Sequence, residues 1–128
     1  MSKLTLVIRV LFGLVFFVFG LNGFLNFLPP QPFPQGVAGE MIDVLLKTTY
    51  FFPLLKIVEL LCGLAILTGY FVPLALVIIA PVVIHINLFH IFLTPPIGLG
   101  LILLAMNVYL GWAYRKSYAE LLKMKTAL

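Results

Sequence analysis

The stretch FPLLKIVELLCGLAILTGY, residues 52–70, decides the fold of this chain. It is apolar over almost its whole length, and a helix needs about 20 such residues to cross the hydrocarbon core of a bilayer. Pro53 falls in the first turn, where the missing N–H costs no helical hydrogen bond. Two charged residues, Lys56 and Glu59, interrupt the run. The stretch therefore predicts a membrane-spanning helix that carries ionisable groups at membrane depth.

Three further stretches have the same character: residues 4–28, 73–93 and 96–114. Hydrophobic residues make up 63% of the chain and charged residues 9%, whereas soluble domains carry about 25% charged and under half apolar residues. A soluble protein of this length could not bury so much apolar surface in its own core. We therefore predict an all-α integral membrane four-helix bundle, formed by residues 1–128 as a single transmembrane domain.

The connection between the first two spans is the longest. Residues 29–39 are rich in Pro, Gly and Gln and predict a loop. Residues 39–49 predict a short amphipathic helix on the membrane surface, because apolar and charged side chains fall on different faces. The apolar face comprises Met41, Val44, Leu45 and Thr48, and the charged face comprises Glu40, Asp43 and Lys47. The later turns, near Gly69 and Thr94, are short and predict antiparallel sequential neighbours.

The basic residues predict the orientation. Six of the eight lie near the two termini: Lys3, Arg9, Arg115, Lys116, Lys123 and Lys125. Lys and Arg are enriched in cytoplasmic segments, so we expect both termini in the cytoplasm, in a bacterial inner (plasma) membrane. Trp112, Tyr109 and Tyr114 then fit an aromatic belt at the inner face. No small-residue cleavage site follows the first span, so we expect it to be retained.

The remaining composition restricts the chemistry. The net charge is +4, but the basic residues flank apolar spans, and we expect no nucleic-acid partner. Cys62 is the only cysteine, so no internal disulfide forms; it is either a small packing residue or a reactive thiol. His85 and His90 are spaced poorly for one metal ion, and we expect no metal site. Four glycines, Gly13, Gly20, Gly23 and Gly63, allow close helix contacts.

Polar side chains gather in the outer half of three predicted helices. At 1.5 Å of rise per residue, Glu59 lies about 10 Å deep and His85 about 12 Å deep. The other depths are about 9 Å for Asn22, 3 Å for Asn26, 9 Å for Asn87 and 5 Å for His90. Beyond Arg9 we expect almost no polar group in the cytoplasmic half, so the outer half is the predicted site.

Two interpretations of Glu59 stand side by side. In the structural one, Glu59 pairs with His85 or an Asn and fastens two helices. In the functional one, Glu59 and His85 form a proton-handling or ligand-binding pair, because imidazole titrates near neutrality. Lys56 either reaches the outer headgroups or pairs with Glu59, and His90 is either interfacial or a ligand contact. The predicted pocket is lined by Asn22, Glu59, His85 and Asn87, with Lys56, His90 and Asn26 as further candidates.

Four segments carry a resemblance to a known family. They are RVLFGL (residues 9–14), FGLNG (19–23), FPLLKIVELLCGL (52–64) and NLFH (87–90). On these segments the chain resembles the DoxX-like family of small four-helix membrane proteins. The resemblance implies a link to membrane redox complexes, since some members are subunits of thiosulfate:quinone oxidoreductases and eukaryotic branches act as cargo receptors or chaperones.

Function does not follow from fold alone, and no thiosulfate-handling motif can be carried over residue by residue. We expect an accessory or quinone/lipid-binding subunit of a membrane redox complex, with an outward-facing polar pocket. The alternatives are a small transporter element and a structural or chaperone-like assembly factor. A quinone is the candidate cofactor. Membrane lipid, a protein partner in a redox complex and a second copy of the chain are the candidate partners.

Overall fold

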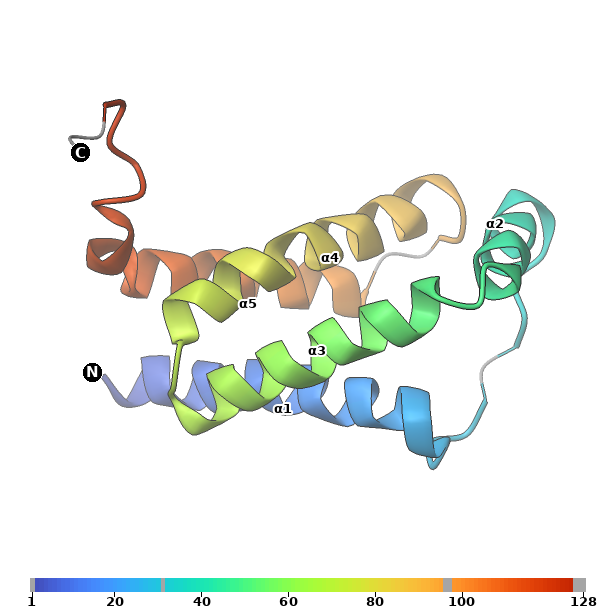
Figure 1. Ribbon diagram of the computed structural model, residues 1–128, viewed down its shortest axis with the longest axis horizontal. Coiled ribbons are helices and arrows are strands. Elements are labelled where there is room, and N and C mark those ends of the chain that lie inside the picture. Colours follow the sequence, from blue (N-terminus) through green and yellow to red (C-terminus); the bar gives the residue numbers. More distant parts are fainter. Residues whose placement is uncertain (1, 31, 96–97, 126–128) are drawn as a thin grey trace.

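The computed structural model describes residues 2–30, 32–95 and 98–125. This part of the chain contains helices and no strand, so the predicted all-α fold is confirmed. The elements are α1 (Lys3–Leu25), α2 (Gly36–Lys47), α3 (Phe51–Thr68), α4 (Val72–Phe92), α5 (Leu99–Ala113) and a short 3-10 helix η1 (Arg115–Tyr118) (Figure 1).

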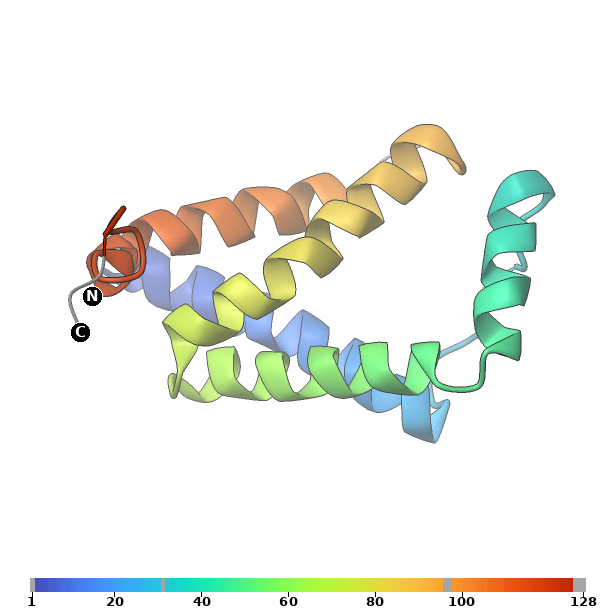
Figure 2. The same ribbon diagram turned by 45° about the horizontal axis from the view of Figure 1, so that its top comes forward.

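Four of these helices pack in a ring. α1 packs against α3 and α5, and α4 packs against the same two helices. The start of α1 and the end of α5 lie at one end of the molecule, and α2 lies across the other end, where it contacts α3 (Figures 1 and 2). The centre of the ring is filled by fully buried side chains, among them Phe12, Ile66, Ile79 and Leu110.

Three helices, α1, α3 and α4, are long and apolar enough to cross a membrane. α5 is apolar as well but has 15 described residues, which is about 22 Å of helix against a hydrocarbon core of about 30 Å. The predicted fourth span was placed at residues 96–114. The helix begins at Leu99 instead, and Pro96 lies outside the described residues.

Local side-chain and backbone chemistry sets the helix ends. α1 was predicted to reach Leu28, but it ends at Leu25 because Asn26 adopts the left-handed conformation with φ 51°. The Oδ1 atom of Asn22 accepts a hydrogen bond of 2.8 Å from the Leu28 N–H and so caps the departing chain. α3 ends at Thr68 because Gly69 takes φ 88°, which glycine adopts without steric cost.

The short helix α2 begins three residues before its predicted start. Its buried residues are Ala38 and Gly39, and Gly39 packs directly on the carbonyl oxygen of Pro34. Of the predicted apolar face, Val44 is 60% exposed. Met41 and Leu45 do turn inward, where they face the ends of α3 and α4.

Glycines bring α1 and α3 into backbone contact. A Cβ atom on Gly13 or Gly20 of α1 would overlap the backbone of α3, and one on Gly63 of α3 would overlap the backbone at Phe17. Small residues let membrane helices approach this closely. The α1–α3 pair is consequently the tightest contact of the fold and leaves the opposite side of α3 to face α4.

Candidate functional site

A cavity lies between α3 and α4. The two helices diverge from the turn at residues 69–71 toward α2 (Figures 1 and 2). The cavity has a volume of about 310 Å³, within the range of roughly 300–1,000 Å³ typical of small-molecule sites. Its walls are almost entirely apolar and include Leu54, Leu55, Val58, Pro81 and Val82. The only ionisable side chains that line it are Glu59 and His85.

A smaller cavity of about 170 Å³ continues this space toward α2. Phe51, Leu55, His85 and Ile86 line both cavities. On the far side the smaller cavity is closed by α2, through Met41, Ile42 and Leu45. Together the two cavities form a groove that runs from α2 to Glu59, which we call the α3–α4 groove.

Glu59 forms an ion pair at the inner end of the groove. Its side chain is 7% exposed, and its Oε2 accepts a hydrogen bond of 3.2 Å from the Lys56 ammonium one turn earlier. The aliphatic stem of Lys56 packs on Gly23 of α1, where a Cβ atom would collide with it. Of the two alternatives for Lys56, the pairing with Glu59 is therefore confirmed. The expected bond from Glu59 to His85 or an Asn was wrong, because the nearest donor is on α3 itself.

His85 lies on the other wall of the groove. It is an exposed residue of α4, and neither ring nitrogen has a hydrogen-bond partner among the described residues. The structure thus brings Glu59 and His85 to one cavity without joining them. An unpaired imidazole facing a cavity can donate to or accept from a ligand.

The two asparagines of α1 do not line the groove. Asn22 binds the backbone of Leu28, and Asn26 is exposed at the left-handed end of the helix. Sequence placed both at the correct end of the bundle, but Asn22 was predicted to line the pocket and this placement was wrong. Its amide oxygen closes the end of its own helix instead, a local bond that competes with tertiary contacts.

Asn87 and His90 also have partners outside the larger cavity. Asn87 is buried and faces α5: its Nδ2 donates bonds of 2.9 Å to the carbonyls of Val83 and Gly100. The prediction that Asn87 lines the pocket was therefore wrong. The Nδ1 atom of His90 lies 3.1 Å from the carbonyl oxygen of Thr94, and His90 lines only the smaller cavity.

The chemistry offered by the groove follows from these placements. The groove has apolar walls, the Glu59 carboxylate with its ion-pair partner Lys56 outside the lining, and the imidazole of His85. Within the described ranges, no three His, Cys, Asp or Glu side chains gather closely enough to hold a metal ion. Cys62 is buried in the core. Such a groove can hold an amphiphile whose polar end meets Glu59 and His85 while its apolar part contacts the walls.

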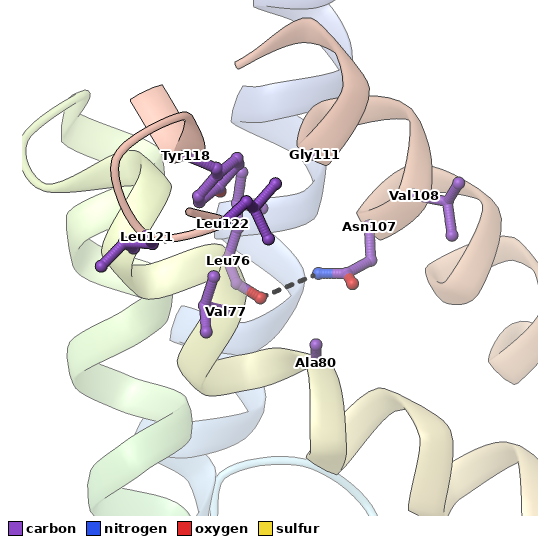
Figure 3. A pocket seen from close by; sticks show the side chains of 9 residues that line it. All are labelled: Leu76, Val77, Ala80, Asn107, Val108, Gly111, Tyr118, Leu121 and Leu122. Carbon is purple, nitrogen blue, oxygen red and sulfur yellow. Dashed lines mark hydrogen bonds between the residues drawn. The ribbon is translucent and has the colours of Figure 1, made fainter. Parts of the chain in front are cut away.

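Sequence reasoning missed a second polar position, in the opposite half of the molecule. Asn107 lies in the middle of apolar α5, and its Nδ2 donates a bond of 3.4 Å to the Leu76 carbonyl of α4. It lines a cavity of about 470 Å³ between α4, α5 and the segment after α5 (Figure 3). The signal was visible, because a strongly polar residue inside an apolar span usually faces the protein interior.

Comparison with known proteins identifies the family. The DoxX family model matches residues 4–91, which cover α1 to α4 and include Lys56, Glu59, His85 and His90. Neither a curated protein nor a solved structure matches the chain. The match spans more than half of the 128 residues and confirms the resemblance seen in the sequence. The chain is a membrane protein that belongs to the DoxX family.

Proposed function

We propose that this DoxX-family protein is an accessory subunit of a membrane redox complex and binds a quinone or lipid in the α3–α4 groove. The observation that carries the proposal is the Glu59 carboxylate, which is paired with Lys56 and lines an apolar cavity together with the imidazole of His85. Charged groups at membrane depth are costly and usually mark a functional site. Structural fastening of the bundle would place such a pair between helices, whereas Lys56 and Glu59 both belong to α3.

Size and polarity of the groove favour an amphiphile with a compact polar head. The larger cavity, of about 310 Å³, holds a ring-sized group. A donor is available from His85 and an acceptor from Glu59, so a ligand with carbonyl or hydroxyl oxygens finds a partner on both α3 and α4. An isoprenoid or acyl tail can leave between the diverging α3 and α4 into the surrounding lipid.

If the ligand is a quinone, the groove supplies protons and the partner supplies electrons. Reduction of a quinone to a quinol takes up two electrons and two protons, and we assign the electrons to the partner in the redox complex and the protons to the groove. His85 is suited to this role because its imidazole lines the cavity and can donate or accept a hydrogen bond. The Lys56–Glu59 pair positions the polar head and keeps the local charge balanced.

We also propose the topology in which α1, α3, α4 and α5 all cross the bacterial inner membrane, with both termini in the cytoplasm. Arg9 supports this orientation, because its guanidinium packs against Gly69 at the carboxyl end of α3, where a helix attracts cations. The aromatic side chains Tyr109 and Trp112 lie at the same end. In this topology the α3–α4 groove lies in the outer half of the bilayer.

Purification of the full chain in a mild neutral detergent, followed by mass spectrometry of retained lipids and quinones, tests the binding proposal. Leu54→Trp places a bulky side chain in the larger cavity, and Leu64→Trp is its matched control on an exposed, non-lining position of the same helix. We expect wild type and Leu64→Trp to retain the same quinone or lipid and Leu54→Trp to lose it. Equal retention by both variants would refute the proposed site.

A further inference from the structure

The cavity at the cytoplasmic end is separate from the α3–α4 groove. Residues of α4 and α5 form its floor, and the segment after α5 forms its third wall through Tyr118, Leu121 and Leu122 (Figure 3). Its volume is about 470 Å³, larger than the cavity of about 310 Å³ at Glu59 and His85. Apart from Asn107 and Tyr118, every lining residue is apolar or glycine, so its interior suits a hydrocarbon chain.

A hydrogen bond attaches the third wall to the bundle. The Tyr118 hydroxyl donates a bond of 2.8 Å to the Pro73 carbonyl at the start of α4. The backbone N–H of Leu122 in turn donates a bond of 3.0 Å to the Tyr118 carbonyl. The segment therefore stands over the cavity as a fixed wall, while Leu121 and Leu122 keep 75% and 77% of their surface exposed.

The same segment is strongly basic. Residues 115–125 contain Arg115, Lys116, Lys123 and Lys125 against the single carboxylate of Glu120, which leaves a net charge of +3. Four or more Lys and Arg residues directly after a membrane helix are typical of segments that bind anionic lipid headgroups. An apolar cavity beside such a segment matches the two parts of an anionic phospholipid, the acyl chain and the charged head.

We propose that this cavity binds an anionic phospholipid of the cytoplasmic leaflet, with one acyl chain between α4 and α5 and the headgroup against residues 115–125. The leaflet assignment rests on the orientation proposed above, but the binding itself does not. Leu121 and Leu122 line the apolar cavity, and Trp112 is exposed in the last turn of α5, as interfacial aromatic residues are. The site is independent of Glu59 and His85, which belong to the α3–α4 groove.

Native mass spectrometry of the full chain in neutral detergent tests this proposal, with dioleoyl phosphatidylglycerol and dioleoyl phosphatidylcholine added in equal amounts. Gly111→Leu fills the cavity, because Gly111 lines it and a Cβ atom at this position meets no atom within 4 Å. Ala105→Leu is the matched control, since Ala105 is exposed on the same helix and does not line the cavity. We expect Gly111→Leu to lower retention of both lipids about tenfold relative to Ala105→Leu.

A charge series tests the headgroup contact. The triple variant Lys116→Gln, Lys123→Gln, Lys125→Gln removes three cations beside the cavity, and Lys47→Gln on α2 removes one at the opposite end. Each basic residue near an anionic headgroup changes affinity on the order of fivefold. Wild type and Lys47→Gln should therefore retain phosphatidylglycerol over phosphatidylcholine by about tenfold or more, and the triple variant should retain the two about equally.

Three results would overturn the proposal. The first is equal retention of both lipids by wild type, and the second is equal retention by Gly111→Leu and Ala105→Leu. The third is a dimer that dissociates on Gly111→Leu, which would assign the cavity to a second copy of the chain. Leu54→Trp should leave phosphatidylglycerol retention unchanged, so failure of the α3–α4 groove and failure of this site can be told apart.

Discussion

Helix α3 meets its two neighbours, α1 and α4, in different ways. Toward α1 it presents Gly63, and Gly13 and Gly20 of α1 approach its backbone until no Cβ atom would fit. Toward α4 it presents Leu55, Val58 and Glu59, and the helices part to leave a cavity of about 310 Å³. One face is filled by backbone contact, and the other is lined by side chains around open space.

This difference indicates how one short helix can serve both the stability of the fold and the proposed binding. Close backbone packing fixes the position of α3, since packed interfaces do not deform continuously. The Lys56 stem packs on Gly23 of the α1 side, while the ammonium reaches Glu59 on the groove side. The glycine face therefore supports the geometry of the groove, and changes on the two faces should have separable effects.

The largest effect is expected on the glycine face. Gly63→Leu forces a side chain into the backbone at Phe17. We expect overpacking of this kind to lower the free energy of unfolding by about 3 kcal/mol. Gly111→Ala is the control, because a Cβ atom there meets open space. We expect thermal unfolding in detergent to show a large loss of stability for Gly63→Leu only. Similar unfolding temperatures for both variants would contradict the close α1–α3 contact.

The next effect concerns the ion pair. Lys56→Met leaves Glu59 buried without its donor, which we expect to cost about 2 kcal/mol, below the roughly 3–5 kcal/mol of fully buried pairs because Lys56 is partly exposed. Glu59→Gln should cost less, since the longer Lys56 side chain can reach toward the interface. The double variant Lys56→Met, Glu59→Gln should regain stability relative to Lys56→Met alone. Additive losses in a double-mutant cycle would show that the two side chains do not interact.

A smaller effect on stability, with a clear effect on binding, is expected at the groove wall. His85→Ala removes an exposed imidazole without a protein partner, so unfolding should change by less than about 0.5 kcal/mol. Ligand retention should fall about fivefold, the value of one hydrogen bond. Leu88→Ala is the control on an exposed, non-lining position of α4. Loss of stability without loss of ligand would assign His85 a structural role.

The last effect lies at the far end of the molecule, outside both faces of α3, and serves as a reference for them. Burial, together with the neighbouring Tyr114, raises the pKa of the Tyr118 hydroxyl above its ordinary value. A raised native pKa means that the stabilisation is complete below the ordinary tyrosine pKa of about 10 and is lost as pH rises through the raised value.

Tyr118→Phe should therefore cost about 1 kcal/mol at neutral pH, the typical net contribution of one hydrogen bond. The difference in unfolding temperature between wild type and Tyr118→Phe should persist at about pH 9 and disappear only above about pH 10. A difference that already disappears near neutrality would contradict the bond to Pro73.

The sequence predicted the helices well because the length and apolar content of each stretch, and the Pro and Gly residues at its ends, are local signals. α1, α3 and α4 fall within a few residues of their predicted spans. The pairing of Lys56 with Glu59 was also accessible, since residues three apart share a helix face. The end of α1 was missed because it depends on one bond from Asn22 to the backbone of Leu28.

The sequence predicted the height of the site residues along their helices, but only partly which neighbouring helix each side chain faces. Rise per residue gave a common height for Glu59, His85, Asn22 and Asn87. The height of a residue along its helix does not determine which neighbouring helix its side chain contacts. That contact depends on how the helices are arranged around α3. Asn87 turned to α5 and Asn22 to its own helix end, so only Glu59 and His85 reached one cavity.

Photo-cross-linking from the groove is the most direct test of the central claim. Leu54 and Leu64 lie on the same helix and both are exposed, but only Leu54 lines the larger cavity. The photoreactive amino acid p-benzoylphenylalanine is placed at one position or the other, and the natively purified chain is irradiated and analysed by mass spectrometry. We predict one dominant adduct with a quinone or a single lipid species from position 54 and a mixture of bulk lipids from position 64. The same mixture of adducts from both positions would contradict a binding site between α3 and α4.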